Sequence, residues 1–304
     1  MSLWYMTVPA KIEMIDDSSC KEIKKNTQNI NKPKENKNKI YYKDKAVVLT
    51  YHHISQNPFT LITIKSERFE KDVKMLIKEG FNVVSIEQLI NAMQGKDVLP
   101  PNAVVITFDD GLESFYKYAF PVLKKYSVPA LMSIITSRTE NYKSFKEDIR
   151  PLNSVEIKEM YESGLVDIAS HTHSSHDFIY INSKLKKGGK LAFKIYDIET
   201  KKIETDEEYI KRVTEDLNTS KEIIYKYIGK YPDILCFPFG HYGKRSIDAA
   251  KSCGFKYFIT TQYGCNTYNS KSIIINRIRA GDNNLTSEKL KDNIIKCAKT
   301  VKKD

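Results

Sequence analysis

The residues of this 304-residue chain that could do chemistry gather in four short clusters. Each follows an apolar run rich in β-branched residues, and together the clusters hold all 6 histidines of the chain. They are YHH (51–53), DDG (109–111), HTHSSH (171–176) and PFGH (238–241). Taken singly, each is weak evidence, since a DDG triplet is a common turn and a lone histidine after a strand is usually a loop residue. Their shared placement predicts that they meet in one site.

Two imidazoles and a carboxylate that converge on one point are the ligands of a catalytic divalent metal, and they leave positions open for water. Asp109 and Asp110 are adjacent, and successive residues at the end of a strand point in different directions. One carboxylate can therefore bind the metal while the other stays free as a base. The cation also offsets the repulsion between the two acids. The residues alone thus predict a metal-dependent active site.

The elements that must position these clusters alternate along the chain. Apolar β-type runs lie at 46–51, 81–85, 103–108, 130–135, 165–170, 234–239, 257–261 and 273–278. Helical patterns separate them, among them 154–164, 206–229 and 286–301. Another is expected to be capped by Ser66 and stopped by Gly80. This alternation predicts a distorted TIM-like (β/α)7-8 barrel, with a doubly wound open sheet as the alternative. In a barrel all four clusters would meet at the carboxyl ends of the strands. The polar stretch 184–206 reads as an inserted loop or small hairpin.

Charge and composition divide the chain into two parts. The formal net charge is +11, and residues 21–45 supply more than half of it with nine lysines against three acids. That tract has almost nothing apolar to bury, so residues 1–45 are expected to form a basic, flexible segment and residues 46–304 the folded domain. Because the basic excess is concentrated in this segment, a nucleic-acid-binding surface on the folded part is not expected.

The cysteines and the apolar runs exclude other classes. The 5 cysteines form no CxxC pair, so neither a disulfide framework nor a thiolate zinc site is indicated. The first 20 residues lack the apolar region of a secretory signal, and no later run is long enough to span a bilayer. We therefore expect no transmembrane segment in this chain.

The motifs resemble those of the NodB-homology polysaccharide deacetylases, carbohydrate esterase family four, over roughly residues 46–300. The family's TFDDG motif corresponds to residues 107–111, and its histidine motif to SHTHSSH, residues 170–176. In most members the second histidine comes four residues after the first, whereas here Ser175 intervenes and the histidine is His176. This spacing, and YHHI at 51–54 ahead of DDG, resemble the biofilm poly-N-acetylglucosamine deacetylases, in which the catalytic-histidine motif lies on the N-terminal side.

The resemblance implies a role for each matching residue. Asp110, His171 and His176 would hold one divalent metal ion, zinc first, with cobalt, nickel or iron as alternatives. Asp109 would be the general base and His52 the acid that protonates the departing amine. The backbone N–H of Phe239, after the motif-three Pro238, would donate to the oxyanion, and Pro238, Phe239 and His241 would border the sugar. We expect His53 to be a packing residue and His173 a loop residue.

One departure from the family concerns the residue that orients the base. Many members have arginine two residues before the motif-three proline, where this chain has Cys236. Arg277, in the last strand pattern, is the candidate to hold Asp109 instead.

The resemblance implies that the protein removes acetyl groups from N-acetylglucosamine units of a surface or biofilm polysaccharide. It also implies an extracellular or cell-surface location, although a signal or anchor is not visible in this chain. Peptidoglycan or chitin-type chains are alternative polymers. A catalytically silent carbohydrate-binding relative is the alternative of another class, and it is disfavoured because Asp109 and the three ligands are all present.

Overall fold

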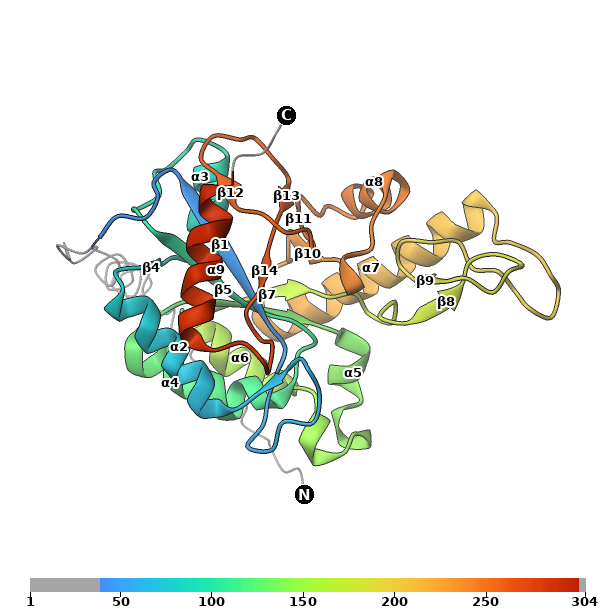
Figure 1. The fold of residues 1–304 in the computed structure, drawn as a ribbon. Helices are drawn as coiled ribbons and strands as arrows, with labels where there is room; N and C mark the ends of the chain where they lie inside the picture. The colour runs from blue at the N-terminus through green and yellow to red at the C-terminus, as the bar shows by residue number, and fades with distance from the viewer. Residues whose placement is uncertain (1–38, 301–304) are drawn as a thin grey trace, which may run out of the picture. The chain divides into compact units, whose positions relative to one another are not determined.

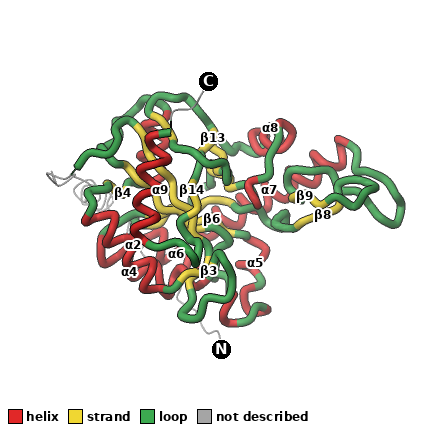
Figure 2. The backbone as a smooth tube through the Cα atoms, viewed as in Figure 1, coloured by secondary structure: helices red, strands yellow, loops and turns green. Residues whose placement is uncertain are grey.

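The computed structural model describes residues 39–300, and a curved sheet forms its centre (Figure 1 and Figure 2). Parallel strands follow one another in the order β1-β5-β6-β7-β10-β11-β13, and β14 then pairs with β1, which brings the sheet round into a nearly closed barrel. The barrel strands are β1 (Lys45–Tyr51), β5 (Ala103–Phe108), β6 (Ala130–Ile134), β7 (Val166–Ser170), β10 (Ile234–Cys236), β11 (Tyr257–Ile259), β13 (Ile274–Ile275) and β14 (Ile278–Arg279). The predicted barrel is confirmed, and the open sheet is not formed.

Two short strands extend the barrel sheet. The strand β4 (Asn82–Val83) pairs with β5, and β12 (Asn266–Thr267) pairs antiparallel with β1. Two small sheets stand apart: β2 (His53–Ile54) with β3 (Thr63–Ile64), and the hairpin of β8 (Phe178–Tyr180) with β9 (Lys187–Gly189).

Helices surround the barrel, as Figure 2 shows. They are α2 (Ser66–Lys78), α3 (Ile86–Met93), α4 (Phe120–Tyr126), α5 (Thr136–Glu140), α6 (Ser154–Glu162), α7 (Asp206–Ile228), α8 (Lys244–Ser252) and α9 (Ser287–Lys299), with a π-helical turn at Phe115–Ala119 and 3-10 turns at Tyr142–Ser144, Glu147–Ile149 and Pro238–Gly240. The helical patterns expected at 154–164, 206–229 and 286–301 are confirmed as α6, α7 and α9.

Three hydrophobic clusters follow from the alternation of side chains along the barrel strands. Outward-facing side chains pack against α2, α4, α6 and α9 in one cluster and against α7 and α8 in another. The third cluster fills the interior with alternate residues such as Val48, Val105, Leu131, Ala169 and Ile259, and α3 adds its apolar face to this inner cluster. Because side chains along a strand point alternately inward and outward, the same alternation determines which residues just after each strand point toward the barrel interior.

The end of helix α2 was predicted correctly, but its N-terminal cap was not. Gly80 has φ +75° and follows the helix end, as predicted for a stop, because that backbone conformation suits glycine. Ser66 is not the cap: Lys65 occupies the N-cap position without a side-chain hydrogen bond. The Ser66 hydroxyl instead accepts a hydrogen bond from the Gln56 amide, at 2.9 Å.

The insertion predicted at 184–206 starts earlier in the structure, because its hairpin already begins with β8. The insertion, residues 178–205, consists of this β8–β9 hairpin and a long loop that runs to the start of α7, and Figure 1 shows it beside the N-terminal half of that helix. Arg212 of α7 fastens it by donating to the backbone carbonyls of Lys190 and Phe193, at 3.0 and 3.1 Å. The insertion is thus attached to the helix that follows it.

Packing of the described chain begins before β1. The Tyr41 ring stacks on Phe81 at 5.4 Å, and the Tyr42 hydroxyl donates to the Ala103 carbonyl at 2.9 Å. Most of the segment expected to be flexible, residues 1–38, lies outside the described residues. Among residues 39–300, no helix combines the length and the apolar character that crossing a bilayer requires.

Candidate active site

The interior of the barrel changes from apolar to polar at the carboxyl ends of its strands. Val48 and Val105 belong to the inner cluster, and counting on by twos leads to His52 after β1 and to Asp109 after β5. By the same count Ala169 leads to His171 after β7. The period of the strands therefore aims these side chains at one end of the barrel, which is where barrel enzymes carry their active sites.

Asp110, His171 and His176 form a group that could hold a metal ion. Each offers a ligand atom, and these atoms all lie within 4.8 Å of one another. Oδ1 of Asp110 lies 3.2 Å from Nε2 of His176 and 3.7 Å from Nε2 of His171. This oxygen is buried and has no hydrogen-bond partner among the described residues, which is costly unless a cation binds it. The carboxylate and two imidazoles fit a divalent metal such as zinc.

The two aspartates diverge because the backbone turns sharply between them. The Asp109 N–H still donates to the Tyr51 carbonyl, at 3.1 Å, which extends the pairing of β1 with β5. Asp110 and Gly111 then adopt left-handed backbone conformations, with φ +75° and +69°. A Cβ on residue 111 would also lie 3.1 Å from the Ile134 side chain, so the turn requires glycine there. The DDG sequence thereby sends Asp110 to the metal group and leaves Asp109 free of it.

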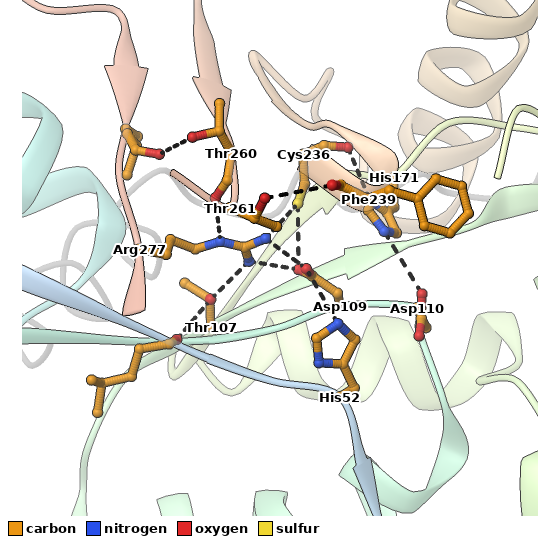
Figure 3. Close-up of polar contacts among 12 residues, drawn as sticks. His52, Thr107, Asp109, Asp110, His171, Cys236, Phe239, Thr260, Thr261 and Arg277 are labelled. Atoms are coloured by element: carbon orange, nitrogen blue, oxygen red, sulfur yellow. Dashed lines mark hydrogen bonds and ion pairs between the residues drawn. The ribbon is translucent and has the colours of Figure 1, made fainter. Parts of the chain in front are cut away.

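Arg277 holds Asp109 through two parallel hydrogen bonds. Nη1 and Nη2 donate to Oδ1 and Oδ2 of Asp109 at 2.9 and 2.7 Å, and Figure 3 shows the pair in the centre of the site. The guanidinium also donates to the Thr260 carbonyl at 2.9 Å and to the Thr107 hydroxyl at 3.2 Å. Such a bidentate geometry fixes the orientation of a carboxylate as well as its charge. Arg277 therefore lies where the sequence predicted a partner for Asp109.

The charge of Arg277 decides the ionisation of Asp109. Burial alone would raise the pKa of Asp109, but the attraction of Arg277 and the neighbouring imidazoles outweighs it and holds the pKa below its ordinary value. Cys236 completes this surrounding, with Sγ 3.4 Å from Oδ1 of Asp109 and 3.4 Å from Nη2 of Arg277. Burial raises the pKa of the Cys236 thiol, so it stays neutral beside the ion pair.

The orientation of His171 is set by a backbone carbonyl. Its Nδ1 lies 2.8 Å from the Cys236 carbonyl, so Nδ1 carries the proton and Nε2 faces Asp110 with a free lone pair. Burial lowers the pKa of His171 to about 4, which keeps the imidazole neutral, as a metal ligand must be. Asp109, His171 and Cys236 form a second group within 4.8 Å. It suits a cation less well, because Arg277 already occupies both oxygens of Asp109 and the thiol is neutral.

The two neighbouring histidines of the YHH cluster have different surroundings. His52 is partly exposed, and its Nε2 lies 3.9 Å from Oδ2 of Asp109 (Figure 3). His53 is buried: its ring nitrogens contact the Thr63 hydroxyl at 3.2 Å and the Asp148 carbonyl at 2.7 Å. Burial lowers the pKa of His53 below its ordinary value. Only His52 therefore borders the polar end of the barrel.

Sequence reasoning missed Asp216, which holds the loop that carries His176. This α7 carboxylate accepts hydrogen bonds from the backbone N–H groups of His173 and Ser174, at 2.9 and 2.7 Å, and from the Ser175 hydroxyl at 2.9 Å. The His173 ring contacts the Thr136 hydroxyl, at 3.0 Å, and does not belong to the metal group. The sequence does contain a signal for this role. Asp216 is an acidic residue on the buried face of α7, which also includes Tyr209, Val213, Ser220 and Ile224.

The PFGH cluster forms a tight turn beside the metal group. Pro238 is buried and begins the turn, since proline cannot continue the ladder of β10. Phe239 has φ +59°, and its ring lies 4.6 Å from the His176 ring, centroid to centroid. Nδ1 of His241 accepts a hydrogen bond from the Gly189 N–H of the insertion, at 3.2 Å. The three residues predicted to border the sugar therefore lie together, next to His176.

The fold and this site define a hydrolase of the polysaccharide deacetylase class. The family model for polysaccharide deacetylase matches residues 96–258, more than half of the chain, so the chain belongs to this family. Membership makes it a hydrolase of amide bonds.

Individual relatives are similar over most of the chain. A poly-beta-1,6-N-acetyl-D-glucosamine N-deacetylase of Staphylococcus aureus (strain MRSA252) is 26% identical in an alignment 262 residues long that covers 80% of this chain and 82% of that protein. The protein of the same name from Escherichia coli (strain K12) is 26% identical over 72% of this chain, which spans only 34% of that longer protein. A de-N-acetylase structure from Aggregatibacter actinomycetemcomitans covers 82% of this chain and 100% of its own, with 28% identity and a TM-score of 0.73.

Proposed function

We propose that this protein removes acetyl groups from N-acetylglucosamine residues of a poly-N-acetylglucosamine-type polysaccharide in a metal-dependent reaction that releases acetate. The observation that carries the proposal is the placement of Asp109. It is ionised, held by Arg277, and lies between His52 and the Asp110, His171 and His176 group. The names of the S. aureus and E. coli relatives support the choice of polymer.

Asp110, His171 and His176 would hold the ion, and their oxygen and nitrogen donors accept zinc, the first candidate, and also cobalt, nickel or iron. When bound, a divalent ion lowers the pKa of water and polarises a carbonyl group. Side chains and one backbone N–H of this chain carry out the remaining steps.

Asp109 takes a proton from the attacking water, whose oxygen forms the new bond to the acetyl carbon. Arg277 keeps the acceptor oxygens of Asp109 in place during this transfer. The backbone N–H of Phe239 donates to the carbonyl oxygen as it gains charge. His52 then gives a proton to the nitrogen while the carbon–nitrogen bond breaks, because an amide nitrogen leaves poorly unless protonated. The products are acetate and a free amine on the sugar.

A surface polysaccharide would place the enzyme outside the cytoplasm or at the cell surface, where the polymer lies. This location belongs to the proposal and follows from its substrate. Localisation of the tagged full-length protein by cell fractionation tests it.

The experiment that tests the proposed reaction is release of acetate from defined β-1,6-linked and β-1,4-linked N-acetylglucosamine oligomers by the zinc-loaded protein. Asp109→Asn should keep its metal and still fold, although with lower stability because buried Arg277 loses its counter-charge. It should lose about a hundred- to ten-thousand-fold in turnover, since it removes the proton acceptor. Asp248→Asn, on exposed α8, is the matched control and should behave as wild type. Faster release from β-1,4-linked oligomers would redirect the proposal to chitin-type or peptidoglycan chains, and undiminished turnover in Asp109→Asn would refute the assignment of the base.

A further inference from the structure

A row of aromatic rings leads from the metal group to the surface of the insertion. The Phe239 ring lies 4.6 Å from the ring of His176, and on its other side it stacks on Phe178 at 4.0 Å with an interplanar angle of 24°. His241 meets Phe178 edge-on at 6.0 Å. Phe178 is 52% exposed although its ring is large and apolar. We call Phe178, Phe239 and His241 the aromatic ledge.

The insertion is fixed against the loops of the site, so the ledge is a built surface. The Gly189 N–H donates to Nδ1 of His241 at 3.2 Å, and Lys190 donates to the Ser174 carbonyl at 3.0 Å. A Cβ on residue 189 would lie 3.1 Å from Nδ1 of His241 and 3.4 Å from the Phe239 ring. A larger residue at 189 would therefore have to push the His241 side chain aside by a few tenths of an ångström. The hairpin holds Phe178 beside the loops that carry His176 and Phe239.

We propose that the aromatic ledge binds the sugar ring next to the one that is deacetylated, through the apolar face of a pyranose unit. The axial C–H groups of a β-linked glucosamine ring form such a face, and aromatic rings attract C–H groups through their negative π surface. The outer side of Phe178 offers this surface. The metal group fixes the position of the acetyl group, so a chain bound there has its neighbouring unit beside the ring row.

This occupant follows from continuity with the candidate active site. The row begins at His176, which belongs to the metal group, and ends at an apolar ring that is half exposed to solvent. A single exposed apolar ring is common on protein surfaces, but this one ends a row of stacked rings that starts in the metal group, and that continuity indicates a binding surface. The inference rests on the proposed function and extends it: the insertion makes the enzyme prefer a chain of sugars over a single acetylated unit.

The experiment compares Phe178→Ala, Phe178→Tyr and wild type on a β-1,6-linked N-acetylglucosamine tetramer and on the small acetyl ester 4-nitrophenyl acetate. Ile198→Ala is the matched control, since Ile198 is an apolar residue of the same insertion with 51% exposure. We expect Phe178→Ala to raise KM for the tetramer about three- to tenfold with little change in kcat, the size expected for one aromatic contact. Phe178→Tyr should restore KM, because it keeps the ring. Hydrolysis of the small ester should be unchanged in every variant.

The possible outcomes separate this inference from the proposed function. If wild type deacetylates the tetramer and Phe178→Ala has the same KM as Ile198→Ala, the ledge is refuted and the reaction stands. If Phe178→Ala slows the small ester as much as the tetramer, Phe178 supports the loop of His176 and does not bind sugar. If wild type hydrolyses the ester and releases no acetate from any N-acetylglucosamine oligomer, the proposed function fails, and the ledge fails with it.

Discussion

Replacing Arg277 by methionine should destabilise the fold far more than a single substitution usually does. The side chains of Arg277 and Asp109 are 1% and 4% exposed, so the substitution would leave a buried carboxylate without its counter-charge. Removing one partner of a buried ion pair costs about 3–5 kcal/mol of unfolding free energy. The Thr260 carbonyl would lose its donor as well. We therefore expect a loss at the upper end of that range.

The double variant Arg277→Met/Asp109→Asn separates the effect of the unpaired Asp109 charge from the loss of the other Arg277 contacts. It removes the unpaired carboxylate, so most of the loss should be recovered, and about 1–3 kcal/mol should remain for the unpaired Thr260 carbonyl. The sign of the pH dependence follows from the same pair. In wild type the pKa of Asp109 lies below its ordinary value, so its stabilising contribution is present at neutral pH and is lost only as the pH falls through that low pKa. In Arg277→Met, burial raises the pKa of Asp109. Acidification from pH 7 to about 5 should therefore reduce the loss of unfolding free energy relative to wild type, because the Asp109 carboxylate takes up a proton.

Urea unfolding at a fixed zinc concentration, followed by circular dichroism, measures these differences. Arg279→Met is the control from the same segment: Arg279 is 64% exposed and its ion pair with Asp282 spans 3.7 Å, so its loss should stay within about 0.5 kcal/mol. A loss below about 1 kcal/mol in Arg277→Met, or a double variant no more stable than the single one, would refute the view that Arg277 neutralises a buried base.

Three further predictions concern other parts of the site and of the chain. His52→Ala should cut turnover on oligomers strongly at unchanged metal content, whereas buried His53→Ala should act mainly by lowering the melting temperature; the reverse ranking in acetate release would contradict the assignment of the acid. Asp216→Ala should weaken zinc binding about ten- to a hundredfold, measured by competition with a chelator, and an unchanged affinity would show that the His176 loop keeps its shape alone. Deleting residues 1–38 should leave urea stability and oligomer deacetylation intact, whereas deleting residues 1–44 should lower stability by a few kcal/mol, since Tyr42 packs in the core.

The sequence was most informative where the period of a strand leads directly into polar residues. The fully buried run of β5, followed at once by two acids and a glycine, predicts that Asp109 and Asp110 point in different directions, and the turn at Asp110 and Gly111 separates them. Helix α2 was less predictable at its start. Ser66 has the right residue type for a cap, but Lys65 takes the N-cap position, and the Ser66 hydroxyl accepts a hydrogen bond from the Gln56 side chain of the preceding loop.

Contacts between distant segments explain what sequence reasoning missed. Asp216 acts on a loop about forty residues earlier, and only the packing of α7 against β7 brings them together. The run at 273–278 was predicted as one strand but is broken into β13 and β14. The side chain of Asn266 exchanges hydrogen bonds with the backbone of Asn276, both at 2.9 Å, in place of a ladder partner, and the chain then turns Arg277 inward. A side chain that replaces a neighbouring strand as the hydrogen-bond partner does not change the pattern of apolar residues, so the sequence does not reveal it.

The break between β13 and β14 has a consequence for how the enzyme loses activity on heating. The residue that holds the base lies in the very segment that closes the barrel, between a strand paired with β11 and one paired with β1. Each of these contacts is only two residues long, so this seam is a natural place for local opening, which in proteins needs less free energy than global unfolding. An opening there would withdraw Arg277 from Asp109 while the rest of the sheet stayed paired. Activity would then fall before circular dichroism reports melting, and amide hydrogens of residues 274–279 would exchange ahead of those in β5.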